Sequence, residues 1–151
     1  MRESAFQQKV LKFLKDKKIY AIKFNASGLT KVGVPDILMC LRGRFVGIEV
    51  KTDTAAAHTG NLVIELITNK ALNKDGWFKV STADKFAFYL EETNEVIFID
   101  ANELKENYKQ ALNRIYTTTQ YECGYIYKEG VIGLLSITQL SNLSSFRRIA
   151  I

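Results

Sequence analysis

Three charged residues interrupt segments of the chain that are otherwise apolar. Asp36 follows Pro35, the only proline, and Glu49 and Lys51 lie two positions apart at the end of the segment 45–51. Charged groups are costly to bury unless they are paired or bind a metal. Two carboxylates can hold Mg²⁺, and a nearby lysine can act on a water molecule or on a phosphate oxygen. These residue types therefore indicate metal-assisted chemistry at a phosphate.

The segment 37–52 must position these groups, and its pattern predicts a β-hairpin. Both halves are rich in β-branched and apolar residues, and a short polar turn with a glycine separates them. A turn at positions 42 and 43 would place Asp36 opposite Glu49, whereas a turn at positions 43 and 44 would place it opposite Lys51. Directly opposed side chains lie within about 5 Å at Cβ, and residues two apart share a face. Either register brings the three groups together, and a slip by one residue separates them.

The motif resembles that of the PD-(D/E)XK nuclease superfamily, which has a restriction-endonuclease-like fold. Upstream residues extend the likeness, because Glu3 lies on an expected first helix and Ser27, followed by a glycine, precedes the Pro-Asp pair. This order is similar to that of Holliday junction resolvases and the related VRR-NUC nucleases. The resemblance covers residues 1–53, about a third of the chain.

The resemblance implies a role for each matched position. Asp36 and Glu49 would bind the metal together with the backbone carbonyl of Val50, and Mg²⁺ is the implied ion, with Mn²⁺ as the alternative. Lys51 would position or deprotonate the attacking water. Glu3 would add a third carboxylate, directly or through water.

Further residues are implied around the scissile phosphate. Ser27 would be the loop serine near that phosphate, and Lys31 of the same loop would contact nucleic acid. Resolvases often carry an arginine shortly before the serine, where this chain has Lys23, and the two cations are not equivalent at phosphates. Gln7 lies one helical turn after Glu3 and shares its side of the helix.

The second half departs from a minimal resolvase. Its segments 59–65, 76–77 and 83–84 are similar to a pattern of some phage-type nucleases. This pattern makes Asp53 and Glu65 further candidate acids. Asp53 shares strand parity with Glu49 and Lys51, whereas Glu65 is either a site acid or an outward strand residue. His58, the only histidine, is favoured as a surface residue over an acid or base. Trp77 is favoured as a core residue or a strand-edge anchor over a base-stacking one.

Composition sets the frame for this site. The chain has 151 residues and a net charge of +5, which predicts a single domain over residues 1–151 and suits a polyanionic partner such as DNA. Cys40 and Cys123 have no metal-site spacing, and reduced thiols in a cytosolic protein are expected. The sequence shows no signal peptide or long apolar span, so no membrane association is expected. The expected source is bacterial, archaeal or phage-encoded.

Periodicity predicts an α/β fold with a mixed central β-sheet flanked by helices, and the resemblance implies that this sheet is restriction-endonuclease-like. Residues 2–17 form an amphipathic helix, and a later helix on the other face runs to about position 116. The other side of the first helix is basic, and a solvated surface is favoured there over DNA contact. Its five lysines are Lys9, Lys12, Lys15, Lys17 and Lys18. Strands are expected at 19–24, 37–41, 45–52, 62–68, 77–80, 86–90 and 96–99. A hairpin turning at 129–130 and a short helix at 137–143 complete the expected elements.

The resulting functional hypothesis is a Mg²⁺-dependent endonuclease that hydrolyses phosphodiester bonds in branched DNA. The alternatives are a phage- or restriction-type endonuclease on linear duplex DNA, and a catalytically inactive DNA-binding module with the nuclease fold. Resolvases act as two-fold dimers, so the resemblance also implies a homodimer. The final segments, from Tyr121 to Leu135, are candidates for its interface or for additional core.

Overall fold

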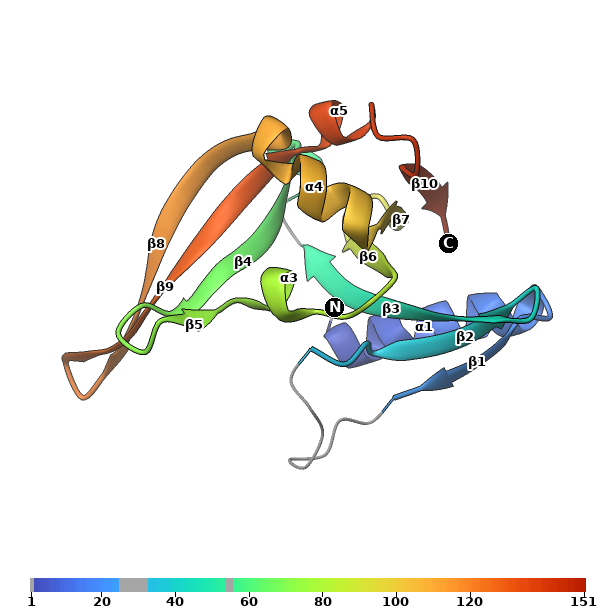
Figure 1. The fold of residues 1–151 in the computed structure, drawn as a ribbon, viewed down its shortest axis with the longest axis horizontal. Helices are drawn as coiled ribbons and strands as arrows, with labels where there is room; N and C mark the ends of the chain where they lie inside the picture. Colours follow the sequence, from blue (N-terminus) through green and yellow to red (C-terminus); the bar gives the residue numbers. More distant parts are fainter. Residues whose placement is uncertain (1, 25–32, 54–55) are drawn as a thin grey trace.

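The fold consists of a six-stranded sheet, a smaller four-stranded sheet and helices around them (Figure 1). A computed structural model describes residues 2–24, 33–53 and 56–151, so Ser27 and Lys31 lie outside the described residues. The helices are α1 (Glu3–Asp16), α2 (Ala56–Thr59), α3 (Trp77–Val80), α4 (Ala101–Ala111) and α5 (Ile137–Leu140). The strands are β1 (Tyr20–Lys23), β2 (Ile37–Leu41), β3 (Arg44–Asp53), β4 (Asn61–Asn69), β5 (Lys74–Asp75), β6 (Lys85–Leu90), β7 (Glu95–Asp100), β8 (Leu112–Glu122), β9 (Tyr125–Ser136) and β10 (Arg147–Ala150).

The six-stranded sheet is mixed and has the order β1-β2-β3-β6-β7-β10. Strands β3 and β6 pair in parallel, and the other neighbours pair antiparallel. Two-residue hairpins favour positive φ at both turn residues, and Arg42 (φ 50°) and Gly43 (φ 76°) meet this requirement between β2 and β3. This turn sets the register of the hairpin that carries the motif.

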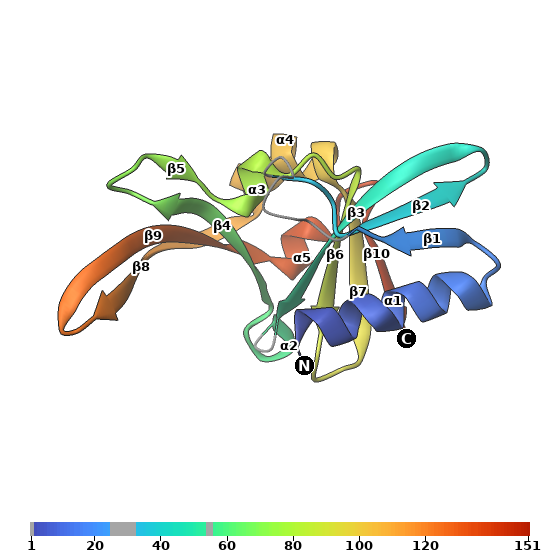
Figure 2. The ribbon, with the colours of Figure 1, turned by 90° about the horizontal axis from the view of Figure 1, so that it is seen from below.

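Two hydrophobic cores lie on opposite faces of this sheet. Figure 2 shows α1 on one side of the sheet and α4 on the other. Helix α1 covers one face, where Phe6 stacks on Tyr89 with 4.6 Å between ring centroids. Helix α4 contributes Leu104 to the core on the other face, together with β6 side chains such as Phe86. The alternation of β6 side chains between the two cores follows from the two-residue period of a strand. The predicted α/β fold with a mixed central sheet flanked by helices is confirmed.

The four-stranded sheet, of order β5-β4-β9-β8, was not predicted as a separate layer. Leu62 and Ile64 of β4 and Leu135 of β9 are fully buried in the core that contains α4. The outer half of the β8–β9 hairpin extends away from this core in both ribbon views (Figures 1 and 2). The inner half of this sheet therefore closes the core, and the outer half forms a protruding arm.

Three predictions about elements are wrong. Residues 77–80 form helix α3 rather than a strand, because a helical turn lets Trp77 and Phe78 both pack against the aromatic core. Helix α4 ends at Ala111 rather than near 116, since the β-branched residues that follow pair with β9. The last hairpin turns at Cys123 (φ 50°) and Gly124 (φ 80°), not at 129–130, because long-range pairing fixes its register.

Strand β10, which the sequence pattern did not predict, pairs with β7 at the edge of the main sheet. Within residues 2–24, 33–53 and 56–151, no helix is long and apolar enough to cross a membrane.

Candidate active site

The β2–β3 hairpin brings Asp36 and Glu49 together, in the first of the two predicted registers. The ladder between the two strands ends at the pair Ile37 and Ile48, so the next positions outward are Asp36 and Glu49. Asp36 Oδ2 accepts a hydrogen bond of 2.8 Å from the backbone N–H of Val50. The carboxylate of Asp36 is thereby held against β3, next to Glu49.

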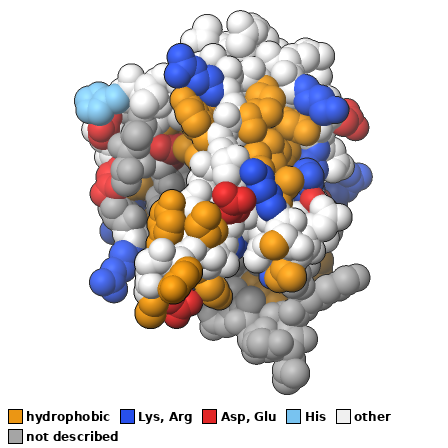
Figure 3. Space-filling model, turned by 90° about the vertical axis from the view of Figure 1, so that its left-hand side faces the viewer, with side chains coloured by type: hydrophobic (Ala, Val, Ile, Leu, Met, Phe, Trp, Pro, Cys, Tyr) orange, Lys and Arg blue, Asp and Glu red, His pale blue; other side chains and the backbone are white. Residues whose placement is uncertain are grey.

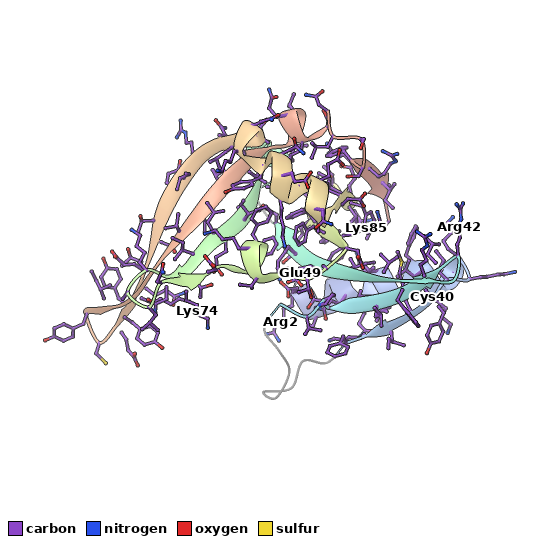
Figure 4. The ribbon with its side chains drawn as sticks, viewed as in Figure 1. Arg2, Cys40, Arg42, Glu49, Lys74 and Lys85 are labelled. Carbon is purple, nitrogen blue, oxygen red and sulfur yellow. The ribbon has the colours of Figure 1, made fainter. Side chains whose placement is uncertain are left out.

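Lys51 lies between two carboxylates. Its Nζ is 2.9 Å from Glu49 Oε1 and 3.8 Å from Glu3 Oε2, which reaches the site from the first turn of α1. The Lys51 side chain is 21% exposed and that of Glu49 is 10% exposed, so the pair is largely shielded from water. Figure 4 shows Glu49 near the middle of the molecule, whereas Arg42 lies at the far end of the hairpin. The predicted convergence of Glu3, Glu49 and Lys51 is present in the structure.

An aromatic ring supports the lysine from another side. Lys51 Nζ lies 5.1 Å from the centroid of the Trp77 ring, within the range of a cation–π contact. Trp77 itself packs edge-on against Phe86 of the core. Its backbone N–H donates to Glu65 Oε1 at 3.4 Å. Trp77 is therefore a core residue, as favoured from the sequence, and it also contacts the motif lysine.

Burial and neighbouring charges shift the pKa values of this pair. Burial raises the pKa of Glu49, and the nearby carboxylates of Asp36 and Glu3 raise it further, against the opposing effect of Lys51. Burial lowers the pKa of Lys51, but the charges of Glu49 and Glu3 outweigh it and leave the pKa above its ordinary value. Lys51 is therefore a cation at neutral pH, set among an excess of negative charge.

The segment before Asp36 is fixed by close backbone contacts. Gly33 has φ 90°, and a Cβ atom there would lie 2.0 Å from the carbonyl oxygen of Val80, so only glycine fits. The Gly33 carbonyl accepts hydrogen bonds from both the N–H and the Oγ1 of Thr82, at 2.7 and 2.9 Å. Pro35 covers Gly47, where a Cβ would lie 2.6 Å from Pro35 Cγ. These contacts explain why the motif carries these two glycines and this proline.

A groove of about 220 Å³ opens beside Glu49. Glu65 and Trp77 line it, as do Lys74 and Asp75 of the short strand β5. Glu65 also accepts a hydrogen bond from Thr68 Oγ1. Glu65 therefore faces the same groove as Glu49 rather than open solvent, so the alternative of an outward strand position does not describe it.

Three further predicted residues lie on α1, β1 and β3. Gln7 is buried on α1, one turn after Glu3. Lys23 ends β1 and pairs with Ile37, directly after Asp36. Asp53 is buried further along β3, and its Oδ2 accepts a 3.0 Å hydrogen bond from Val63 N.

His58 makes a contact outside the cluster. Its Nε2 lies 3.0 Å from Glu92 Oε1, and its side chain is 83% exposed. The surface position favoured from the sequence matches this environment.

Sequence analysis did not identify Lys105. Lys105 is half-buried on α4, and its Nζ donates to the Ser81 carbonyl at 2.6 Å. Burial lowers the pKa of Lys105 against the opposing charge of Glu49. Lys105 lies 54 positions after Lys51 in a helix with ordinary lysine spacing, so no local pattern distinguishes it. Only the packing of α4 over the main sheet brings it near the motif.

The donor set suits a hard divalent cation. Within residues 2–24, 33–53 and 56–151, no three His, Cys, Asp or Glu side chains are grouped closely enough to hold a metal by themselves. Mg²⁺ is commonly bound by one or two carboxylates, with water and substrate phosphates completing its shell. Asp36 and Glu49 provide two such carboxylates. Burial is the main cause of the raised pKa of Glu49, and a cation bound beside it would favour its charged form.

Comparisons with known proteins give structural neighbours only. No family model and no curated protein matches the chain. Hjc, a Holliday junction resolvase from the archaeal hyperthermophile Archaeoglobus fulgidus, is similar with 18% identity and a TM-score of 0.46, over 92% of this chain and 99% of that one. A bacterial homing endonuclease is similar with 17% identity and a TM-score of 0.45, over 66% of this chain and 63% of that one. At these values the likeness does not establish a function, which must be inferred from the site residues themselves.

Proposed function

We propose that this protein is a metal-dependent DNA endonuclease of the PD-(D/E)XK type. The observation that carries the proposal is the placement of Asp36 beside Glu49, with Lys51 2.9 Å from Glu49 and Glu3 within 3.8 Å of Lys51. A purely structural ion pair needs one carboxylate for each lysine. Here two carboxylates contact one lysine and the charge of Asp36 acts on it as well, which is costly for folding unless a cation or a reaction uses them.

Asp36, Glu49 and the carbonyl of Val50 would hold the metal, with Mg²⁺ as the first choice and Mn²⁺ as the alternative. In an extended strand the N–H and C=O of one residue leave on the same side. Because the N–H of Val50 points to Asp36, its carbonyl leaves toward Asp36 as well. The bound ion would polarise the phosphate and lower the pKa of a coordinated water.

Lys51 would act mainly as a fixed positive charge. Its pKa lies above the ordinary lysine value, so at neutral pH it donates hydrogen bonds rather than accepting a proton. Glu49 and Trp77 hold its Nζ in place. In that position it can orient the attacking water or stabilise charge on the phosphate oxygens. Glu3 restrains the lysine from the α1 side.

Branched DNA is the proposed substrate because Glu3 and Ser27 match the resolvase order in the sequence. Linear duplex DNA is the competing substrate. The groove lined by Glu65 and Trp77 beside Glu49 belongs to the part of the chain that departs from a minimal resolvase.

A cleavage assay on matched substrates tests the proposal. Purified protein is incubated with four-way, flap and linear DNA of equal strand composition, with Mg²⁺, Mn²⁺ or EDTA. We expect metal-dependent cleavage with a preference for the four-way junction. Equal cleavage of linear duplex would favour the restriction-type activity. Binding without cleavage under every metal condition would leave an inactive DNA-binding module.

For the homodimer, the proposed contact is the edge strand β8. The strand is exposed almost throughout, and an exposed edge is a template for pairing with another chain. Figure 3 faces this end of the molecule and shows hydrophobic side chains gathered on its surface. Ile115 and Tyr121 of β8 are 57% and 68% exposed.

The sequence of β8 is complementary to itself in an antiparallel pairing. A two-fold axis at Thr118 places Arg114 opposite Glu122 of the second copy, and Ile115 opposite Tyr121 of the second copy. Opposite charges and paired apolar side chains across strands stabilise such a ladder. The pairing of β8 with β9 is irregular at two places. One lies before Arg114, and the other, between Gln120 and Tyr121, is an extra residue in β9 rather than in β8. A regular ladder across residues 114–122 is thus available to a second copy.

A further inference from the structure

Helix α1 and strand β1 enclose a groove of about 710 Å³, on the side of the main sheet that carries α1. Four lysines line this groove, namely Lys12, Lys15, Lys18 and Lys23. Among residues 2–24, 33–53 and 56–151, no aspartate or glutamate lines it. The groove is therefore a concave surface of a single charge sign, which concentrates positive potential.

The groove lysines differ from the other lysines of α1 in their contacts. Lys9 donates to Tyr89 Oη and Asn94 Oδ1 at 3.4 and 3.1 Å, and the Lys17 Nζ lies 5.8 Å from the Phe13 ring centroid. Among the residues that the structure describes, none of the four groove lysines forms an ion pair or a cation–π contact. Their charges remain available to a ligand, whereas the folded chain already uses the charges of Lys9 and Lys17.

The position of Lys18 adds to this contrast. Lys18 has φ 57°, directly after the end of α1, at a site where glycine is the usual residue. Its N–H still closes the helix on the Lys15 carbonyl at 2.8 Å. Glycine would meet this backbone requirement more easily than lysine, so the geometry of the turn gives no reason for a cation there.

The groove leads to the active site. Lys23 pairs with Ile37, the residue after Asp36, and the next residue of the chain, Phe24, donates its N–H to the Asp36 carbonyl at 2.8 Å. Helix α1 starts at the site with Glu3, and β1 returns to the site at Lys23, so Lys12, Lys15 and Lys18 lie progressively farther from the motif and Lys18 is at the far end of the groove. Helix α1 rises about 1.5 Å per residue, so the track extends over several nucleotides of a DNA strand.

We infer that this groove binds the phosphate backbone of the DNA that flanks the cleaved bond; the inference rests on the proposed nuclease function. Lysine ammonium groups contact phosphates as point charges without reading sequence, and such contacts dominate nucleic-acid affinity. Tyr20, at the edge of the groove and 69% exposed, offers a hydroxyl or a ring face to the same strand. For the lysine-bearing face of α1, a DNA-binding surface thus replaces the solvated surface that was favoured from the sequence.

The test compares two variants with the same change in net charge. The groove variant carries Lys12→Gln, Lys15→Gln and Lys18→Gln. The control variant carries Lys17→Gln, Lys109→Gln and Lys128→Gln, all outside the groove. Binding to a fluorescent DNA duplex is measured in EDTA, so that no cleavage occurs, at several salt concentrations. Thermal unfolding followed by circular dichroism verifies that both variants fold.

For the groove variant we expect the slope of log K against log salt to fall by about 2 to 3, because each lost phosphate contact removes about 0.9. Its affinity should fall at least roughly 10-fold at moderate salt. The control should change the slope by less than about 1. Equal changes in the two variants, or no change in either, would overturn the groove as the phosphate-binding surface.

A cleavage assay in Mg²⁺ separates this inference from the proposed function. Wild-type protein that cleaves DNA, with equal salt slopes in both variants, would overturn the groove alone. Wild-type protein that binds DNA through the groove but cleaves no DNA would overturn the nuclease function and retain the groove.

Discussion

Asp36 shows how one side chain combines folding and chemistry. Its Oδ2 accepts the N–H of Val50, which secures the register of the hairpin, and its carboxylate faces Glu49 across the strands. An asparagine keeps an acceptor oxygen for that N–H but loses the negative charge. The two roles of Asp36 can therefore be separated by a single substitution.

Asp36→Asn is expected to lower cleavage by roughly 100-fold or more, because changes in the shell around a metal already cost about 10- to 100-fold. Thermal stability and DNA affinity should remain close to wild type, since most DNA contacts are made to phosphates elsewhere. Mg²⁺-dependent plasmid cleavage and calorimetry measure the two effects. Asp16→Asn, an exposed residue at the end of α1, is the matched control. Full activity of Asp36→Asn would refute the assignment.

Lys51→Ala is expected to lower the cleavage rate by about 10²–10³, the usual effect of removing a group that stabilises developing charge. Single-turnover rates at saturating Mg²⁺ measure it. Lys85→Ala is the control, because Lys85 is a half-buried lysine in the adjacent strand β6 that pairs with Asp100. A loss below about threefold for Lys51→Ala would mean that the lysine serves only the ion pair with Glu49.

At the scale of elements, the C-terminal segment is attached to α4 by one carboxylate. Glu103, in the first turn of α4, accepts hydrogen bonds from the N–H and hydroxyl groups of Ser144 and Ser145. These bonds lower the pKa of Glu103 from 4.5 to about 2. We call these four hydrogen bonds the Glu103 clasp. The segment that they hold leads into β10, which completes the main sheet beside β7.

This clasp predicts a pH dependence of stability. A depressed pKa in the folded state stabilises the protein above the unfolded value, and the contribution is lost as the pH falls from about 4.5 toward about 2. Glu103→Gln should therefore unfold at lower urea concentration than wild type at pH 7, and the difference should shrink in acid. Urea unfolding across this pH range measures it. Glu106→Gln, an exposed residue of the same helix, should match wild type, and a constant difference for Glu103→Gln at every pH would exclude the clasp.

At the scale of the whole molecule, the proposed pairing of two β8 strands predicts a charge-reversal pattern. Arg114→Glu and Glu122→Arg should each weaken the dimer, because like charges would face each other across the two-fold axis. The double variant should restore dimerisation. Sedimentation velocity at micromolar concentration measures the association. A wild-type monomer under these conditions, or a double variant as weak as the singles, would exclude this interface.

The motif and its hairpin were predictable because the causes are local. Alternation and β-branched residues indicate strands, and Arg42-Gly43 suits a turn with positive φ at both residues. The spacing of Glu49 and Lys51 then places both on one face of β3, as the ion pair confirms. Helix α1 and the β6–β7 pair were predictable for the same reason.

The sequence by itself therefore determined the motif, the first helix and the α/β class. The tertiary structure decided the register that places Asp36 opposite Glu49, since two turn positions were compatible with the sequence. It also decided the contact of Trp77 with Lys51, the approach of Lys105 from α4 and the separate sheet that contains β8. Each of these depends on pairing or packing between residues far apart in the chain. Local propensity carries no information about such contacts, because their free energy comes from burial and strand pairing that exist only in the folded protein.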